Sequence, residues 1–156
     1  MIISGTGHRP SYFPCGYDEN NKWSNDIKQS IADNLLKYKA SKVLSGMALG
    51  FDMWLAEAAI QLQIPVEALL PFHGQEKRWP KQSQERYNNI LAQCSNVEYI
   101  NEAYSNAAFF ARDDSLINRA DLMLALYDQT VQSGGTYYTY HKALTIGKEV
   151  INLWPN

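Results

Sequence analysis

Leu122-Met-Leu-Ala-Leu-Tyr-Asp-Gln-Thr-Val-Gln-Ser-Gly-Gly-Thr136 joins an apolar run to a polar turn that contains two glycines. The apolar run is typical of a buried β-strand, and a helix-like segment follows the turn as far as about Gly147. Glycines let the backbone approach an anion closely, and the first N–H groups of a helix have no partners within it. The stretch therefore predicts a strand, a phosphate-binding turn and a helix.

Two earlier stretches repeat this arrangement. Ser4-Gly-Thr-Gly-His-Arg9 follows the residues Met1-Ile-Ile3, and Ser45-Gly-Met-Ala-Leu-Gly50 follows Lys42-Val-Leu44. Each places glycines directly after a short apolar segment. Three glycine-bearing strand exits in one small chain indicate a nucleotide site.

Strand-like and helix-like segments alternate along the chain. Strands are expected at about 2–4, 42–44, 64–70, 97–100, 121–127 and 149–153, and helices at about 24–38, 50–62, 80–94, 106–119 and 135–146. This alternation predicts an α/β fold, a three-layer sandwich with a mostly parallel sheet of five to six strands and helices on both faces. Such sheets bind ligands at the C-terminal strand ends, where strand order reverses. We expect the first and fifth strands to be neighbours, with the cleft between their exits.

Length and composition limit the class of protein. A chain of 156 residues is expected to form a single domain, 1–156, with one core. The net charge of −2 argues against stable nucleic-acid binding, which usually needs a basic surface. Cys15 and Cys94 are isolated thiols that fit a reducing compartment. Met1 leads directly into a strand and no apolar run approaches the roughly 20 residues of a membrane span, so we expect a cytoplasmic protein without a membrane partner.

The histidines and cysteines show no metal-binding spacing. His8, His73 and His141 lie too far apart in the sequence to form a readable ligand set. We therefore expect no metal and no required cofactor, with a nucleotide as the ligand. The high aromatic content of 12% and the helix at 106–119 favour a homodimer.

Gly5, Thr6, Gly7, His8 and Arg9 form the first candidate binding motif. The glycines would let main-chain amides face a phosphate, and the Thr6 hydroxyl would donate to it. The planar guanidinium of Arg9 would hold an anion. The alternative is a tight turn with an exposed arginine, and a lone histidine such as His8 is more often structural than catalytic.

Gly46, Met47, Gly50 and Asp52 form the second candidate motif. Asp52 falls in the first turn of a predicted helix, where the dipole favours a carboxylate. It either holds a ribose hydroxyl or caps the helix, and capping is favoured. Glu57, further along this helix, either reaches the cleft or points to solvent.

Charged and aromatic residues elsewhere supply further candidates. Arg78 and Trp79 suit the outer phosphates or the base of a nucleotide, or else belong to a solvated loop. Arg112 and Asp113 belong to a charged triplet that faces either the cleft or a partner subunit. Asp128 either accepts from a ribose or holds its loop.

The turn after the fifth strand is the strongest single signal, because strand, turn and helix follow one another in register. Its candidate ligand-binding residues are Ser133, Gly134, Gly135 and Thr136. With this turn, the chain resembles the SLOG superfamily, close to its YspA/YpsA-like branch. The resemblance covers nearly the whole chain and rests on the order of Ser4-Gly-Thr-Gly-His-Arg-Pro10, Ser45-Gly-Met-Ala-Leu-Gly-Phe-Asp52, Leu70-Pro-Phe, Gln75-Glu-Lys-Arg-Trp-Pro80 and Ser133-Gly-Gly-Thr136.

Membership implies a Rossmann-like fold and a site for nucleotides or nucleotide-derived ligands such as ADP-ribose or NAD derivatives. Some SLOG proteins sense nucleotide second messengers in antiviral signalling. Others, the Lonely Guy enzymes, cleave the N-glycosidic bond of nucleoside monophosphates and carry the signature PGGxGTxxE with a catalytic glutamate. When Gly135-Thr136 is laid on the GT of that signature, Thr139 falls at the glutamate. A threonine cannot replace a carboxylate there, so that chemistry does not carry over.

Two main functions follow from these residues. The leading hypothesis is a protein that senses or sequesters a nucleotide-derived small molecule, an ADP-ribose-like, NAD-derived or cyclic nucleotide signal. The alternative is an enzyme, an N-glycosidase or phosphoribohydrolase acting on nucleoside monophosphates or NAD-type substrates. Its carboxylate would come from outside the signature, and the candidates are Asp52, Glu57, Asp113 and Asp128. A third possibility is a regulatory protein with a vestigial pocket.

Overall fold

Six parallel strands form one sheet at the centre of the structure, a computed structural model that describes residues 1–156. The strands are β1 (Ile2–Gly7), β2 (Lys42–Ser45), β3 (Val66–Leu70), β4 (Asn96–Tyr99), β5 (Leu122–Leu126) and β6 (Glu149–Asn152). Their order across the sheet is β4-β3-β2-β1-β5-β6, and every neighbouring pair is parallel.

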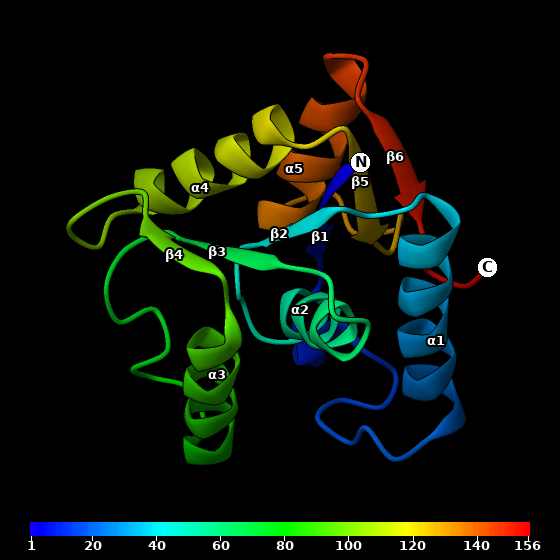
Figure 1. The fold of residues 1–156 in the computed structure, drawn as a ribbon, viewed down its shortest axis with the longest axis horizontal. Coiled ribbons are helices and arrows are strands. Elements are labelled where there is room, and N and C mark those ends of the chain that lie inside the picture. Colours follow the sequence, from blue (N-terminus) through cyan, green and yellow to red (C-terminus); the bar gives the residue numbers. More distant parts are fainter.

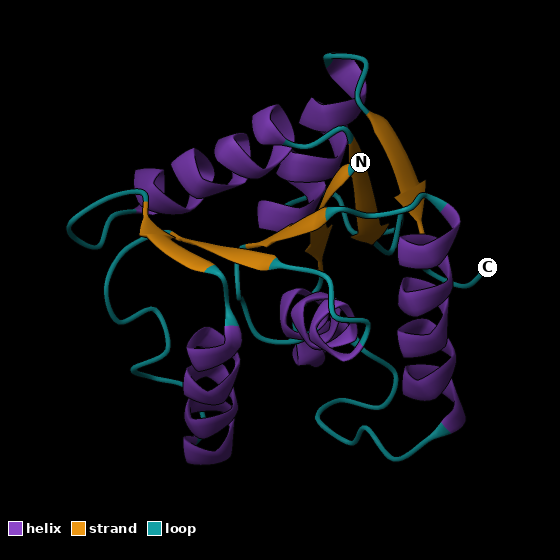
Figure 2. Ribbon diagram, viewed as in Figure 1, coloured by secondary structure: helices purple, strands orange, loops and turns teal.

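Helices cover both faces of this sheet (Figure 1). They are α1 (Lys22–Lys37), α2 (Phe51–Gln61), α3 (Lys81–Gln93), α4 (Asn106–Arg119) and α5 (Gly135–Thr145), with a short 3-10 helix, η1 (Pro10–Tyr12). Figure 2 shows α4 and α5 on one side of the strands and α1, α2 and α3 on the other. The predicted three-layer α/β fold is confirmed, and the sheet is parallel throughout. None of the helices combines the length and the apolar character that a membrane crossing requires.

The strand order reverses between β1 and β5. The chain runs outward from β1 to β4 and then returns to place β5 beside β1, with Gly5 opposite Leu124 and Gly7 opposite Leu126. The predicted adjacency of these two strands is therefore confirmed. Their carboxyl ends meet at the position where sheets of this class bind ligands.

Helical spacing of apolar residues explains how α1 packs. Ile27, Ile31 and Leu35 recur every four residues, and all three are buried. The helix begins earlier than predicted, because Asn21 and not Ser24 is its N-cap. The Asn21 side chain accepts a hydrogen bond from the Ser24 N–H at 2.9 Å. Both residue types are good caps, so the sequence alone did not separate them.

Gly5 and Gly7 lie inside β1 and not in a turn after it. A Cβ built on Gly5 would lie 2.6 Å from Leu55 Cδ2 and 2.8 Å from Phe51 Cε1, and one on Gly7 would collide with Phe51. The two glycines therefore allow α2 to pack closely against the end of β1. This close packing brings the start of α2 next to the strand exits.

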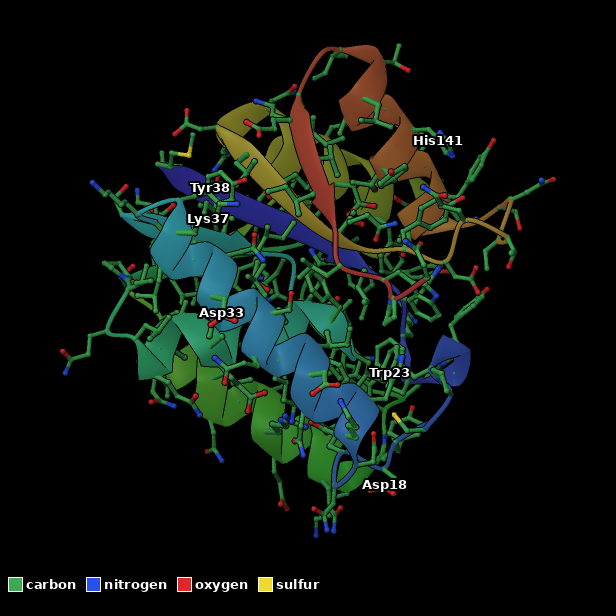
Figure 3. All side chains as sticks on the ribbon, turned by 90° about the vertical axis from the view of Figure 1, so that its right-hand side faces the viewer. Asp18, Trp23, Asp33, Lys37, Tyr38 and His141 are labelled. Carbon is green, nitrogen blue, oxygen red and sulfur yellow. The ribbon has the colours of Figure 1, made fainter.

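The connection between β1 and α1 is long but well anchored. Glu19 accepts a hydrogen bond from Trp54 Nε1 at 2.8 Å and forms ion pairs with Lys28 and Arg86. Trp23 packs against Phe13 of the same connection, with 5.2 Å between ring centroids. Figure 3 shows Trp23 at the end of α1 that adjoins this connection and Tyr38 at the opposite end. These contacts tie the connection that contains η1 to α1, α2 and α3.

Candidate functional site

A cavity of about 510 Å³ lies at the carboxyl ends of β1 and β5. Its walls come from β1 and η1, the start of α2, the first half of α4 and the turn before α5. Its volume falls within the roughly 300–1,000 Å³ that is usual for small-molecule sites. Eleven of the predicted ligand-binding residues line it: Gly5, Thr6, Gly7, His8, Arg9, Asp52, Arg112, Ser133, Gly134, Gly135 and Thr136.

The N-terminus of α5 forms one wall of the cavity. Gly134 is its N-cap residue and has a φ of 95°, a conformation that residues with a Cβ rarely adopt. No side chain caps this end of the helix. The first N–H groups of α5 therefore lack partners within the helix and are available to an anion in the cavity.

The exit of β1 forms a second wall. Arg9 is exposed there, and none of the eight ion pairs of the protein involves it. His8 is buried, and its Nε2 accepts a hydrogen bond from the backbone N–H of Asp128 at 3.0 Å. Burial lowers the pKa of His8, which favours this neutral, accepting form. His8 thus joins the exits of β1 and β5. Arg9, the next residue, has no ion-pair partner.

A buried ion pair on α4 forms a third wall. Arg112 donates from Nε to Asp113 Oδ1 at 2.7 Å and from Nη1 to the carbonyl oxygen of Gly46 at 2.7 Å. Only 5% of Arg112 and 8% of Asp113 is exposed. Arg112 and Asp113 of the charged triplet therefore face the cavity, whereas Asp114 pairs with Lys142 of α5. Arg112 connects α4 to the exit of β2.

Asp52 is the second buried carboxylate of the cavity wall. Its Oδ2 accepts a hydrogen bond from the Ala48 N–H at 3.2 Å, so it caps the turn before α2. Burial raises the pKa of Asp52 to about 6, although the positive charge of Arg112 opposes this shift. Burial also raises the pKa of Asp113, with Arg112 and the Thr139 hydroxyl opposing it. A carboxyl whose pKa is about 6 exchanges its proton close to neutral pH, as general acids and bases do.

Residues of the second glycine motif lie largely outside the cavity. A Cβ on Gly46 would lie 2.8 Å from Arg112 Nη1, so this glycine makes room for the buried guanidinium. Met47 is fully buried in the core. Gly50 has a φ of 91° and packs under the carbonyl oxygen of His8. These three residues therefore support residues that line the cavity and do not line it themselves.

Four further candidates also lie away from the cavity. Arg78 is exposed, and Trp79 packs against Tyr87 with 5.2 Å between ring centroids. Asp128 accepts hydrogen bonds from the N–H and hydroxyl of Thr130, at 3.0 and 2.8 Å, and so holds its own loop. Glu57 forms an ion pair with Arg86 at 2.6 Å.

Five residues of the cavity were not predicted as ligand-binding or catalytic candidates. They are Tyr12, Ala48, Asn106, Phe109 and Phe110. For Phe109 the sequence does hold a signal, since it precedes Arg112 by three residues and so shares a helix face with it. Tyr12 lies in an irregular connection with no periodicity, and nothing in the sequence distinguishes it from neighbouring tyrosines.

Comparisons with known proteins find relatives along nearly the whole chain. A model of the YspA SLOG family matches residues 3–151. The UPF0398 protein YpsA of Bacillus subtilis is 29% identical over 147 residues, which are 87% of this chain and 81% of the relative. A UPF0398 protein of Bacillus pumilus is 32% identical over 138 residues, covering 81% of this chain and 73% of that protein.

Solved structures with the same fold correct one prediction. DNA processing protein A from Streptococcus pneumoniae matches 96% of this chain with a TM-score of 0.62 and 17% identity, although the chain spans only 49% of that protein. DNA processing protein A from Helicobacter pylori matches 96% of this chain with a TM-score of 0.66 and 19% identity, and the match covers 63% of that protein. Its structure was described for the way in which that protein binds single-stranded DNA. The exclusion of nucleic-acid binding is therefore wrong, because a protein with this fold binds single-stranded DNA and net charge alone does not rule such a partner out.

Proposed function

Because the chain belongs to the YspA SLOG family, we propose that its cavity binds a nucleotide-derived small molecule, an ADP-ribose-like, NAD-derived or cyclic nucleotide signal, which the protein senses or sequesters. The observation that carries this proposal is the meeting of two anion-binding features in one cavity. These are the uncapped N-terminus of α5 and the unpaired guanidinium of Arg9. Both favour a phosphate group, through the helix dipole and through charge-assisted hydrogen bonds.

Isothermal calorimetry tests this proposal with ADP-ribose, NAD, AMP and cyclic nucleotides. A short single-stranded oligonucleotide belongs in the panel, because the Helicobacter pylori neighbour is described by its single-stranded DNA binding mode. Arg9→Ala is expected to weaken binding about ten-fold or more, since it removes a charged phosphate contact. Arg78→Ala is the matched control, because Arg78 is an exposed arginine outside the cavity. No binding by any nucleotide at high micromolar concentration contradicts the proposal.

A second candidate function is cleavage of an N-glycosidic bond. The observation that favours it is that Asp52 of α2 and Asp113 of α4 line the same cavity, both with raised pKa values. Hydrolysis breaks the C1′–N bond and joins the water oxygen to C1′. The base leaves with the bonding electrons and takes up a proton, and the water gives one up. In this function Asp52, whose pKa is raised to about 6, serves one of these transfers, and Asp113, whose pKa is also raised by burial, serves the other.

Chromatography for free base separates the two functions after incubation with AMP, other nucleoside monophosphates and NAD. Asp52→Asn and Asp113→Asn are expected to abolish base release, whereas Glu57→Gln keeps it, because Glu57 pairs with Arg86 outside the cavity. Base release that survives both Asn variants shows that these carboxyls are not the catalytic groups. If no substrate releases free base, only the binding function remains.

A homodimer stays a prediction. The scattering mass in solution tests it against 17.7 kDa for one chain.

A further inference from the structure

Aromatic side chains form the part of the cavity that the phosphate-binding features do not explain. Tyr12, Phe109 and Phe110 line it together with the glycine turns. Tyr12 is 51% exposed and Phe110 is 42% exposed. Large aromatic side chains left exposed within a polar cavity indicate a flat, apolar part of a ligand.

Tyr12 is held in one orientation by its surroundings. Its ring stacks on His8, with 4.6 Å between centroids and 16° between planes. Tyr12 is the last residue of η1, which begins at Pro10. Phe13, the next residue, is buried against Trp54, with 5.0 Å between ring centroids. His8 covers one face of the tyrosine ring and fixes its orientation. The other face of the ring is therefore the part that remains exposed.

Phe110 comes from a different element, at the start of α4. Its ring meets Tyr138 of α5 edge to face, with 4.7 Å between centroids and 76° between planes. The ring of Phe109 is held in the same way by Phe72, at 5.3 Å and 87°. The exposed aromatic rings of the cavity therefore come from η1 and α4, whereas the phosphate-binding features come from Arg9 and α5.

We propose that Tyr12 and Phe110 form a base-binding subsite, so that the ligand of this cavity carries a nucleobase on Tyr12 and a phosphate at α5. This inference rests on the proposed nucleotide function and deepens it. It excludes plain sugar phosphates and inorganic phosphates as the main ligands. Stacking on an aromatic ring tolerates any base, because every base has a π-face. The subsite therefore selects for a base without strong preference among bases.

Calorimetry with ligands that differ only in the base tests the subsite. The ligands are AMP, UMP and ribose 5-phosphate, which has a hydroxyl in place of the base. For the wild-type protein, the two nucleotides are expected to bind at least about ten-fold more tightly than ribose 5-phosphate, because the stacking of one base adds this much affinity. In Tyr12→Ala this advantage is expected to fall to within a few-fold, and Phe110→Ala reduces it in the same sense.

Conservative and matched variants separate stacking from a structural effect. Tyr12→Phe keeps the ring and is expected to keep nucleotide affinity. Tyr17→Ala removes a 58% exposed tyrosine of the same connection that does not line this cavity, and it changes nothing. Equal loss of affinity for AMP and ribose 5-phosphate in Tyr12→Ala overturns the inference, because Tyr12 then only supports the loop.

Two other outcomes have distinct meanings. Binding of AMP that is unchanged in both Tyr12→Ala and Phe110→Ala contradicts the base-binding subsite and leaves the proposed function standing. Absence of binding by every ligand to the wild-type protein contradicts the proposed function, and the subsite with it.

Discussion

The Asp52 carboxyl is buried in the cavity wall, and its pKa is raised from an ordinary value of 3.8 to about 6. Between these two values the folded protein binds more protons than the unfolded chain. Stability contributed by the protonated acid is therefore present below the unfolded pKa and is lost as pH rises through the folded pKa. The shift corresponds to about 3 kcal/mol of stability between the two ends of this window.

Asp52→Asn keeps an acceptor for the Ala48 N–H but removes the ionisation. Relative to the wild type, the variant is expected to gain up to about 3 kcal/mol in free energy of unfolding as pH rises from about 4 to about 7. Urea denaturation across this range measures it. Asp26→Asn is the control, because Asp26 is exposed in a surface pair with Lys22. Wild-type and Asp52→Asn profiles that stay parallel would show that Asp52 ionises normally.

Gly46 is a glycine because of a side chain 66 residues away. The Arg112 guanidinium occupies the space of its missing Cβ, with Nη1 at 2.8 Å. Gly46→Ala is expected to destabilise the protein by about 1–3 kcal/mol, since a buried charged group must move. Gly135→Ala is the matched control, because its Cβ would meet only Asp113 Oδ2 at 3.9 Å. Equal thermal midpoints for the two variants would contradict this reading of Gly46.

The sequence identified many cavity residues but not always the reason for them. Glycines after apolar runs predicted that the backbone approaches an anion closely. At Gly134 the backbone does need a glycine, because its φ is 95°. Gly5 and Gly46 instead make room for Leu55 and Arg112, which lie far away in the chain. Local patterns cannot distinguish these two uses of glycine, because the neighbouring side chain comes from another element.

At the scale of elements, one arginine on α3 holds the connection that carries η1. Arg86 pairs with Glu19 of that connection and with Glu57 of α2. Although burial raises the pKa of Glu19, hydrogen bonds from Arg86 and Lys28 lower it to about 2. The contribution of Glu19 is therefore present above its ordinary pKa of 4.5 and is lost as pH falls toward 2.

Arg86→Ala is expected to release residues 10–21, because it leaves Glu19 and Glu57 without their shared cation. The side chains are partly solvated, so the cost is about 1–2 kcal/mol in free energy of unfolding. Amide hydrogen exchange measures the release, and the variant is expected to exchange faster only in residues 10–21. Arg119→Ala is the control, since Arg119 pairs with Glu98 at the surface beside β4. Uniform acceleration across α4 and β5 would mean that Arg86 supports the whole fold instead.

Element type was the most predictable level of this structure. The alternation of apolar strands and amphipathic helices depends on nearby residues, and all five helices and six strands appear where the sequence places them, within a few residues at their ends. The clamp of Glu19 by Arg86 was not predictable, because it joins positions 67 residues apart. The same holds for Tyr12 and Phe110, which only the fold brings into one cavity.

At the scale of the whole molecule, the strand order determines where the cavity lies. Because β5 returns to lie beside β1, the exits of both strands and the N-terminus of α5 open on one cavity. The sheet lies between two helical layers, so the cavity is present in the fold without a bound ligand. Net charge, a property of the whole molecule, misled the prediction about nucleic acid, since it averages over surfaces that a ligand meets separately.

A crystal structure of the protein soaked with ADP-ribose tests the central claim most directly. The account predicts phosphate oxygens within hydrogen-bond distance of the Gly135 and Thr136 N–H groups and of the Arg9 guanidinium, with the adenine on Tyr12. Density for the ligand away from the β1 and β5 exits, or a phosphate that contacts neither α5 nor Arg9, would contradict it.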